Sequence, residues 1–159
     1  MKTLLVPIDF SAASETVLDA ATATARALGA RVVLVHVIEP LVALDESSEM
    51  IEDEVVATER AVEGKLDELR CRCTALGIPA SARLLYGTAP HQVTEEALRL
   101  RPDLIVIGSH GHGAIYSLLA GGVTAQVLRH APCPVLVIPV GAHAAAAAPA
   151  AAAQPAWTG

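Results

Sequence analysis

The chain has 159 residues, which suffices for one domain and is too short for two of ordinary size. Apolar residues make up 53% of it, enough for a core although part of that share is alanine near the C-terminus. The formal net charge is −6 and basic residues form no cluster, so nucleic-acid binding is not expected. We find no membrane span, no signal peptide and, with three cysteines, no disulfide framework, and we therefore expect a cytoplasmic protein.

Five short apolar runs alternate with longer amphipathic stretches. The runs cover residues 4–8, 32–38, 80–85, 104–107 and 135–140. The second, fourth and fifth are nearly continuous Val, Ile and Leu, as expected of strands that are buried on both faces. We therefore predict five strands.

Helical spacing between the runs predicts four helices. They are expected over residues 11–28, 50–76 and 88–100, with a last one ending near residue 130. Ser11 is the expected N-cap of the first helix, and Gly29 and Gly77 are expected to end the first two. Pro90 suits the first turn of the third helix.

Strict alternation of strands and helices predicts parallel pairing with right-handed crossovers, and thus a doubly wound α/β sheet with helices on both faces. Pro134 and Pro139 flank the last run, and proline cannot donate to a ladder, so this strand is expected at a sheet edge. Because an apolar edge strand favours pairing with a second copy, we expect a homodimer through Val135–Val140. We predict one domain over residues 1–140 and an Ala/Pro-rich tail over residues 141–159.

Ligands of open α/β sheets bind at the carboxyl ends of the strands. There the first strand ends in Pro7 and Asp9, the second ends in Val37, and the fourth runs into a loop rich in glycine. Glycines let backbone N–H groups approach a phosphate, and the start of the following helix adds free donors and a positive dipole. The loop matches neither a P-loop nor a dinucleotide fingerprint. A set of tight turns is the alternative interpretation of these glycines.

These segments together resemble the universal stress protein family. The resemblance covers residues 1–140 and is carried by Pro7-x-Asp9-x-Ser11, His36-Val37, Gly108-x2-Gly111-x9-Gly121 and the closing segment 128–137. It implies a five-stranded Rossmann-like domain of the adenine nucleotide alpha hydrolase-like type, a homodimer, and ATP binding, with Mg²⁺, in a regulatory stress-response role. Carried over by position, Pro7, Asp9 and Val37 would frame the adenine and ribose. The phosphates would be held by Ile107, Gly108, Gly111, Gly121, Gly122 and Val123.

Two positions depart from the family's ATP-binding pattern. Gly122 stands where that pattern has Ser or Thr. Losing this hydroxyl donor should weaken ATP binding about ten- to a hundred-fold. Thr124, two residues on, is expected to substitute in part. His112 stands where many relatives have Arg or Lys, and neither residue occurs between Arg101 and Arg129. A protonated His112 would supply the missing cation only in mildly acidic conditions.

The sequence leaves alternatives open for the function. ATP binding competes with a nucleotide-free dimeric module of the same family and with a weak ATP hydrolase in which Asp9 positions metal or water. Asp9 is equally well explained as an acid at the start of a helix. The spacing of His110 and His112 does not favour a zinc site, and His36 is expected to be packed and hydrogen-bonded. The cysteines are expected to be ordinary thiols.

Overall fold

The computed structural model describes residues 1–39, 49–110 and 122–140. In chain order its elements are β1 (Lys2–Pro7), α1 (Ala13–Leu28), β2 (Ala30–Ile38), α2 (Glu49–Ala75), β3 (Ala80–Tyr86), α3 (Ala89–Leu100), β4 (Leu104–His110), α4 (Val123–His130) and β5 (Val135–Val140). The strands and helices expected from the apolar runs and the helical spacing are thus present, with bounds within a few residues of those expected. The predicted tail, residues 141–159, lies outside the described residues.

The five strands form one parallel sheet in the order β3-β2-β1-β4-β5. The predicted fold class is confirmed, and β5 lies at a sheet edge as its flanking prolines indicated. The chain winds outward from β1 through β2 to β3 and then returns to the other side of β1 with β4. The strand order therefore reverses between β1 and β4, which is where open α/β sheets bind ligands.

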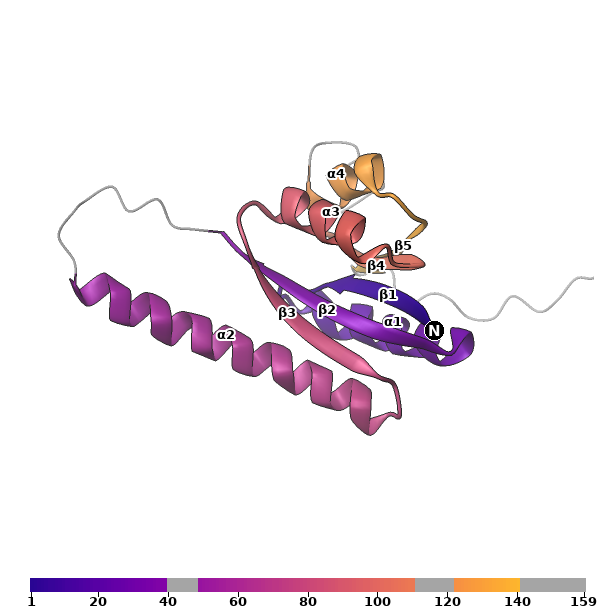
Figure 1. Ribbon diagram of the computed structural model, residues 1–159, viewed down its shortest axis with the longest axis horizontal. Helices are drawn as coiled ribbons and strands as arrows, with labels where there is room; N and C mark the ends of the chain where they lie inside the picture. The colour runs from indigo at the N-terminus through magenta and orange to yellow at the C-terminus, as the bar shows by residue number, and fades with distance from the viewer. Residues whose placement is uncertain (40–48, 111–121, 141–159) are drawn as a thin grey trace, which may run out of the picture.

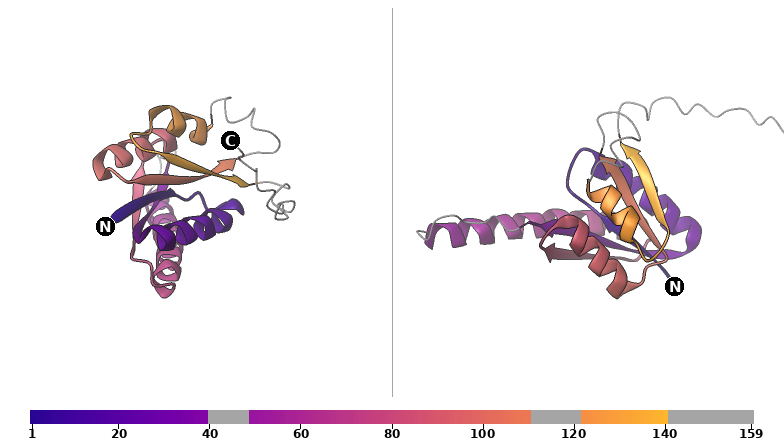
Figure 2. Two further views of the ribbon diagram at one scale, coloured as in Figure 1. Left: turned by 90° about the vertical axis from the view of Figure 1, so that its right-hand side faces the viewer. Right: turned by 90° about the horizontal axis from the view of Figure 1, so that it is seen from above.

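Helices cover both faces of the sheet, α1 and α2 on one side and α3 and α4 on the other (Figures 1 and 2). The core is accordingly split into two clusters: Leu4 and Val6 of β1 pack toward α1 and α2, whereas Leu5 packs toward α3 and α4. Because β1 is covered on both faces, successive residues must all be apolar, which explains the continuous run in the sequence.

The start of α1 differs from the prediction. Ser11 is not the N-cap; Ala12 occupies that position, and no side chain of the N-cap residue bonds to the helix. Instead Asp9 Oδ1 accepts hydrogen bonds from the Ser11 N–H and the Ser14 hydroxyl, both at 3.0 Å. The carboxylate of Asp9, two residues after β1, thus holds the turn that leads into α1.

The ends of the helices follow the predictions more closely. Gly29 ends α1 in the left-handed conformation, with φ 60°, and its N–H bonds to carbonyls of the last turn. Gly77, with φ 77°, follows the end of α2. Only glycine adopts such angles at little cost, so these two residues determine where the helices stop.

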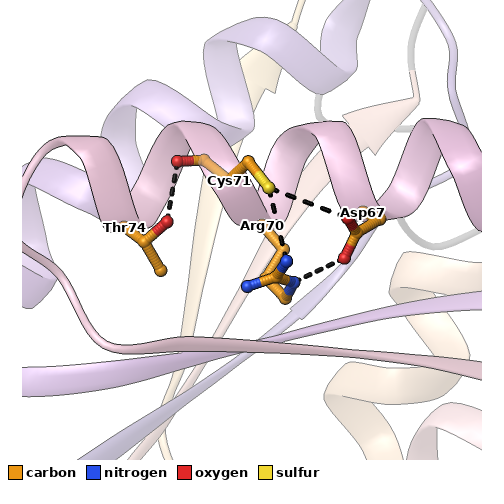
Figure 3. A network of polar contacts seen from close by, with 4 residues as sticks. All are labelled: Asp67, Arg70, Cys71 and Thr74. Carbon is orange, nitrogen blue, oxygen red and sulfur yellow. Dashed lines mark hydrogen bonds and ion pairs between the residues drawn. The ribbon is translucent and has the colours of Figure 1, made fainter.

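Helix α2 is long, and its N-terminal half extends past the sheet (Figure 1). Its C-terminal half packs on the sheet through the buried Leu66 and Cys73. The outward side of that half carries a polar network in which Asp67 accepts from Arg70 and the exposed Cys71 thiol lies against both (Figure 3). Among the described residues, no helix combines the length and the apolarity that crossing a bilayer requires.

Candidate functional site

A pocket of about 150 Å³ opens at the carboxyl ends of the central strands, at the point where the strand order reverses. Six of the nine residues predicted to bind a nucleotide line it: Pro7, Asp9, Val37, Ile107, Gly108 and Val123. These residues come from the ends of three strands and the start of α4. The fold therefore brings together positions that are up to 116 residues apart, from Pro7 to Val123 (123 − 7 = 116).

The three other predicted residues do not belong to the described wall. Gly122 is exposed and is the N-cap of α4, directly before the wall residue Val123. Gly111 and Gly121 lie outside the described residues, as does His112. The pocket wall that the structure describes therefore includes Gly108, before residues 111–121, and Val123, after Gly122.

The structure also adds wall residues that the sequence did not indicate. Ala13, Ser14 and Val17 come from α1, and Ala89 and Val93 come from α3. The α1 residues closely follow Asp9, so their proximity could have been inferred. Ala89 and Val93 carried no signal, because their pattern is that of an ordinary amphipathic helix.

The turn after β1 has an unusual backbone. Phe10 adopts φ 58°, in the left-handed region that side-chain-bearing residues rarely occupy. Its ring lies 4.6 Å, centroid to centroid, from the ring of His36. The His36 Nδ1 lies 2.7 Å from the Ile8 carbonyl oxygen, which can only accept, so this nitrogen carries the proton. The expectation of a packed and hydrogen-bonded His36 is confirmed.

Thr124 joins the two sides of the pocket. Its buried hydroxyl donates to the Gly108 carbonyl at 2.8 Å and so ties the first turn of α4 to the end of β4. The expectation that Thr124 replaces the hydroxyl missing at Gly122 is therefore wrong. A hydroxyl has one proton, a phosphate requires a donor, and this proton is directed at a protein carbonyl.

The pocket is mostly apolar, with Asp9 as the carboxylate of its wall. Asp9 uses one oxygen to organise the start of α1, which agrees with its interpretation as an acid that begins a helix. Within the described part of the chain, no group of three or more His, Cys, Asp or Glu side chains is arranged to hold a metal ion.

Comparisons with known proteins identify the family and agree with the fold. The model of the universal stress protein family matches residues 1–139. A universal stress protein of Thermus aquaticus is 36% identical over 139 residues, covering 86% of this chain and 98% of the relative. A structure from the same family, from Burkholderia pseudomallei, is 30% identical with a TM-score of 0.67, over 87% of this chain and 96% of that one. A universal stress protein solved in complex with cAMP is 25% identical with a TM-score of 0.68, over 86% and 95% of the two chains.

Proposed function

Since this chain belongs to the universal stress protein family, we propose that it binds an adenine nucleotide and acts as a regulatory stress-response module. ATP together with Mg²⁺ is the proposed ligand in that role, and binding rather than catalysis is its basis. The observation that carries the proposal is the convergence of Pro7, Asp9, Val37 and Gly108 on one pocket at the switch point of the sheet.

The walls divide into two parts with different chemistry. Pro7 and Val37, with neighbouring core residues, form an apolar region that suits a base, and an apolar cavity of this size takes up a benzene-sized ring. The start of α4 forms the other part, where the N-cap Gly122 contributes no side-chain bond and the first N–H groups point outward from the helix. A base on the first part would place its phosphate near the second. The relative solved with cAMP supports an adenine nucleotide as the ligand class.

Calorimetric titration with ATP, AMP and cyclic AMP in the presence of Mg²⁺ tests the proposal. The informative variant is Ala89→Leu, which adds bulk to a pocket wall and should weaken binding at least about tenfold. Ala57→Leu makes the same chemical change on an exposed part of α2 and should leave binding unchanged.

Equal loss in both variants, or none in either, would place the ligand elsewhere. The nucleotide-free alternative predicts no heat with any of the three ligands and no nucleotide in the mass spectrum of the purified protein. We assign Asp9 no catalytic role, because its Oδ1 organises the start of α1.

We also propose that the protein is a homodimer joined through β5. This strand is at the sheet edge, and Leu136 on it is 36% exposed. Leu136→Glu should convert the dimer to a monomer in light scattering after size exclusion. Leu98→Glu, at an exposed leucine of α3, is the matched control and should leave the mass unchanged.

A further inference from the structure

The positive charges of this chain lie away from the pocket. All eleven Lys and Arg residues lie in the part of the chain that the structure describes. None of them is among the pocket-lining residues of that part. Seven lie at the opposite edge of the sheet, at the starts of strands or the ends of helices: Lys2, Arg26, Arg31, Arg72, Arg99, Arg101 and Arg129.

The helices account for much of this distribution. Each of the four helices has an arginine in its last turn, where a cation interacts favourably with the helix dipole. In a parallel α/β sheet, the last turn of each helix lies at the amino edge of the strands, opposite the ligand edge (Figure 1). The preference that stabilises each helix therefore removes cations from the end at which the pocket opens.

Two exposed carboxylates, in contrast, lie at this edge of the sheet: Asp9 in the pocket wall, and Glu39 beside the wall residue Ala89. Asp9 Oδ1 accepts from the Ser11 N–H at the start of α1. Glu39, the residue after β2, accepts through Oε1 from the N–H of Ala89, a pocket-wall residue that begins α3, at 3.2 Å. An incoming anion would meet negative charge at both of these helix starts.

At the start of α4, the N-cap Gly122 has no side chain and makes no capping bond. A helix N-terminus is equivalent to about half a positive charge, which partly offsets one phosphate group and leaves further phosphates uncompensated. Each further phosphate adds repulsion from Asp9 and Glu39, and because both carboxylates are exposed, salt screens this repulsion.

We infer that this pocket selects among adenine nucleotides by charge: a ligand with a single phosphate charge, such as cyclic AMP, binds more tightly than free ATP, and ATP binds as its Mg²⁺ complex. The inference rests on the proposed adenine-nucleotide function and adds the class of nucleotide that the site takes. The helix start at Gly122, the two carboxylates Asp9 and Glu39, and the arginines at the opposite edge together carry it.

Titrations of the full chain with cyclic AMP and ATP, each in EDTA and in Mg²⁺, test the inference. In EDTA, ATP should bind roughly tenfold or more weakly than cyclic AMP, and Mg²⁺ should reduce that difference. Added NaCl should strengthen the binding of free ATP, because it screens repulsion. A pocket lined by cations would show the opposite salt dependence.

Glu39→Gln removes one of the two carboxylates while keeping an oxygen that can accept from Ala89. It should raise the affinity for free ATP several-fold more than that for cyclic AMP. Glu68→Gln changes the net charge equally at an exposed site on α2, and both affinities should stay unchanged.

The outcomes separate the two proposals. If free ATP binds as tightly as cyclic AMP and weakens with salt, the charge inference is overturned and the nucleotide function stands. If Glu39→Gln and Glu68→Gln change the two affinities alike, charge at the pocket is not what discriminates, which also overturns the inference. If neither nucleotide binds in either buffer, the proposed function fails and the inference fails with it.

Discussion

Replacing Phe10 by glycine or by alanine tests the backbone geometry at the rim of the pocket. Both substitutions remove the ring that lies against His36, so their difference isolates the backbone. At φ 58° a residue with a Cβ is strained by about 1–2 kcal/mol, and glycine relieves this strain. Glycine also makes the unfolded chain more flexible, which costs about 0.4–1 kcal/mol. The net expectation is that Phe10→Gly is more stable than Phe10→Ala by about 0.5–1 kcal/mol, the reverse of the order in a helix or strand interior.

Urea denaturation of both variants gives the difference in unfolding free energy directly. The matched control is Gly29→Ala, at φ 60°, where an added Cβ would meet no atom within 4 Å and the cost is purely conformational. That variant should lose a similar amount, about 0.5–1 kcal/mol, relative to the original chain. If Phe10→Ala proves as stable as Phe10→Gly while Gly29→Ala is destabilised, the left-handed conformation of Phe10 is refuted.

Three further predictions concern the surface and the core. Native protein should react with a maleimide at the exposed Cys71. Cys73 is buried and burial raises the pKa of its thiol, so it should react only on unfolding. Rapid labelling of Cys73 in the native protein, detected by mass spectrometry, would contradict its buried position. Arg72 donates to both carboxylate oxygens of Glu15 and so lowers the pKa of Glu15 from its ordinary value. A double-mutant cycle of this exposed pair should give about 0.5 kcal/mol near neutrality. Because a lowered pKa stabilises only the ionised form, this coupling should vanish as the pH falls through the pKa of the folded state, and a coupling that persists in strong acid would argue against the ion pair. Glu96→Gln should lower the free energy of unfolding in urea by about 1–2 kcal/mol, because Glu96 is 5% exposed and accepts from Arg83 and Arg99. An unchanged free energy of unfolding would contradict the ion pairs of this buried carboxylate.

Short-range patterns in the sequence were sufficient for the elements and for part of the site. The continuous apolar runs indicated strands buried on both faces, and Gly29 and Gly77 marked helix ends because glycine adopts the left-handed angles found there at little cost. Asp9 and Gly108 could be assigned to one edge because the carboxyl ends of parallel strands always share it. The hydrogen bond from the Thr124 hydroxyl to the Gly108 carbonyl was not predictable, because the two groups come together only in the folded chain.

The sequence alone therefore determined the order of strands and helices, the parallel sheet and the strand ends that form the pocket, since these depend on periodicity and on neighbours a few residues apart. Tertiary structure decided which helices complete the wall, as with Ala89 of α3, and which carboxylates stand at the helix starts, as with Glu39. It also decided that, of eleven basic residues, none joins the pocket wall that the structure describes and seven lie at the opposite edge of the sheet. Net charge is a sum over the sequence, whereas the potential that a ligand meets depends on distances, and these exist only once the chain has folded.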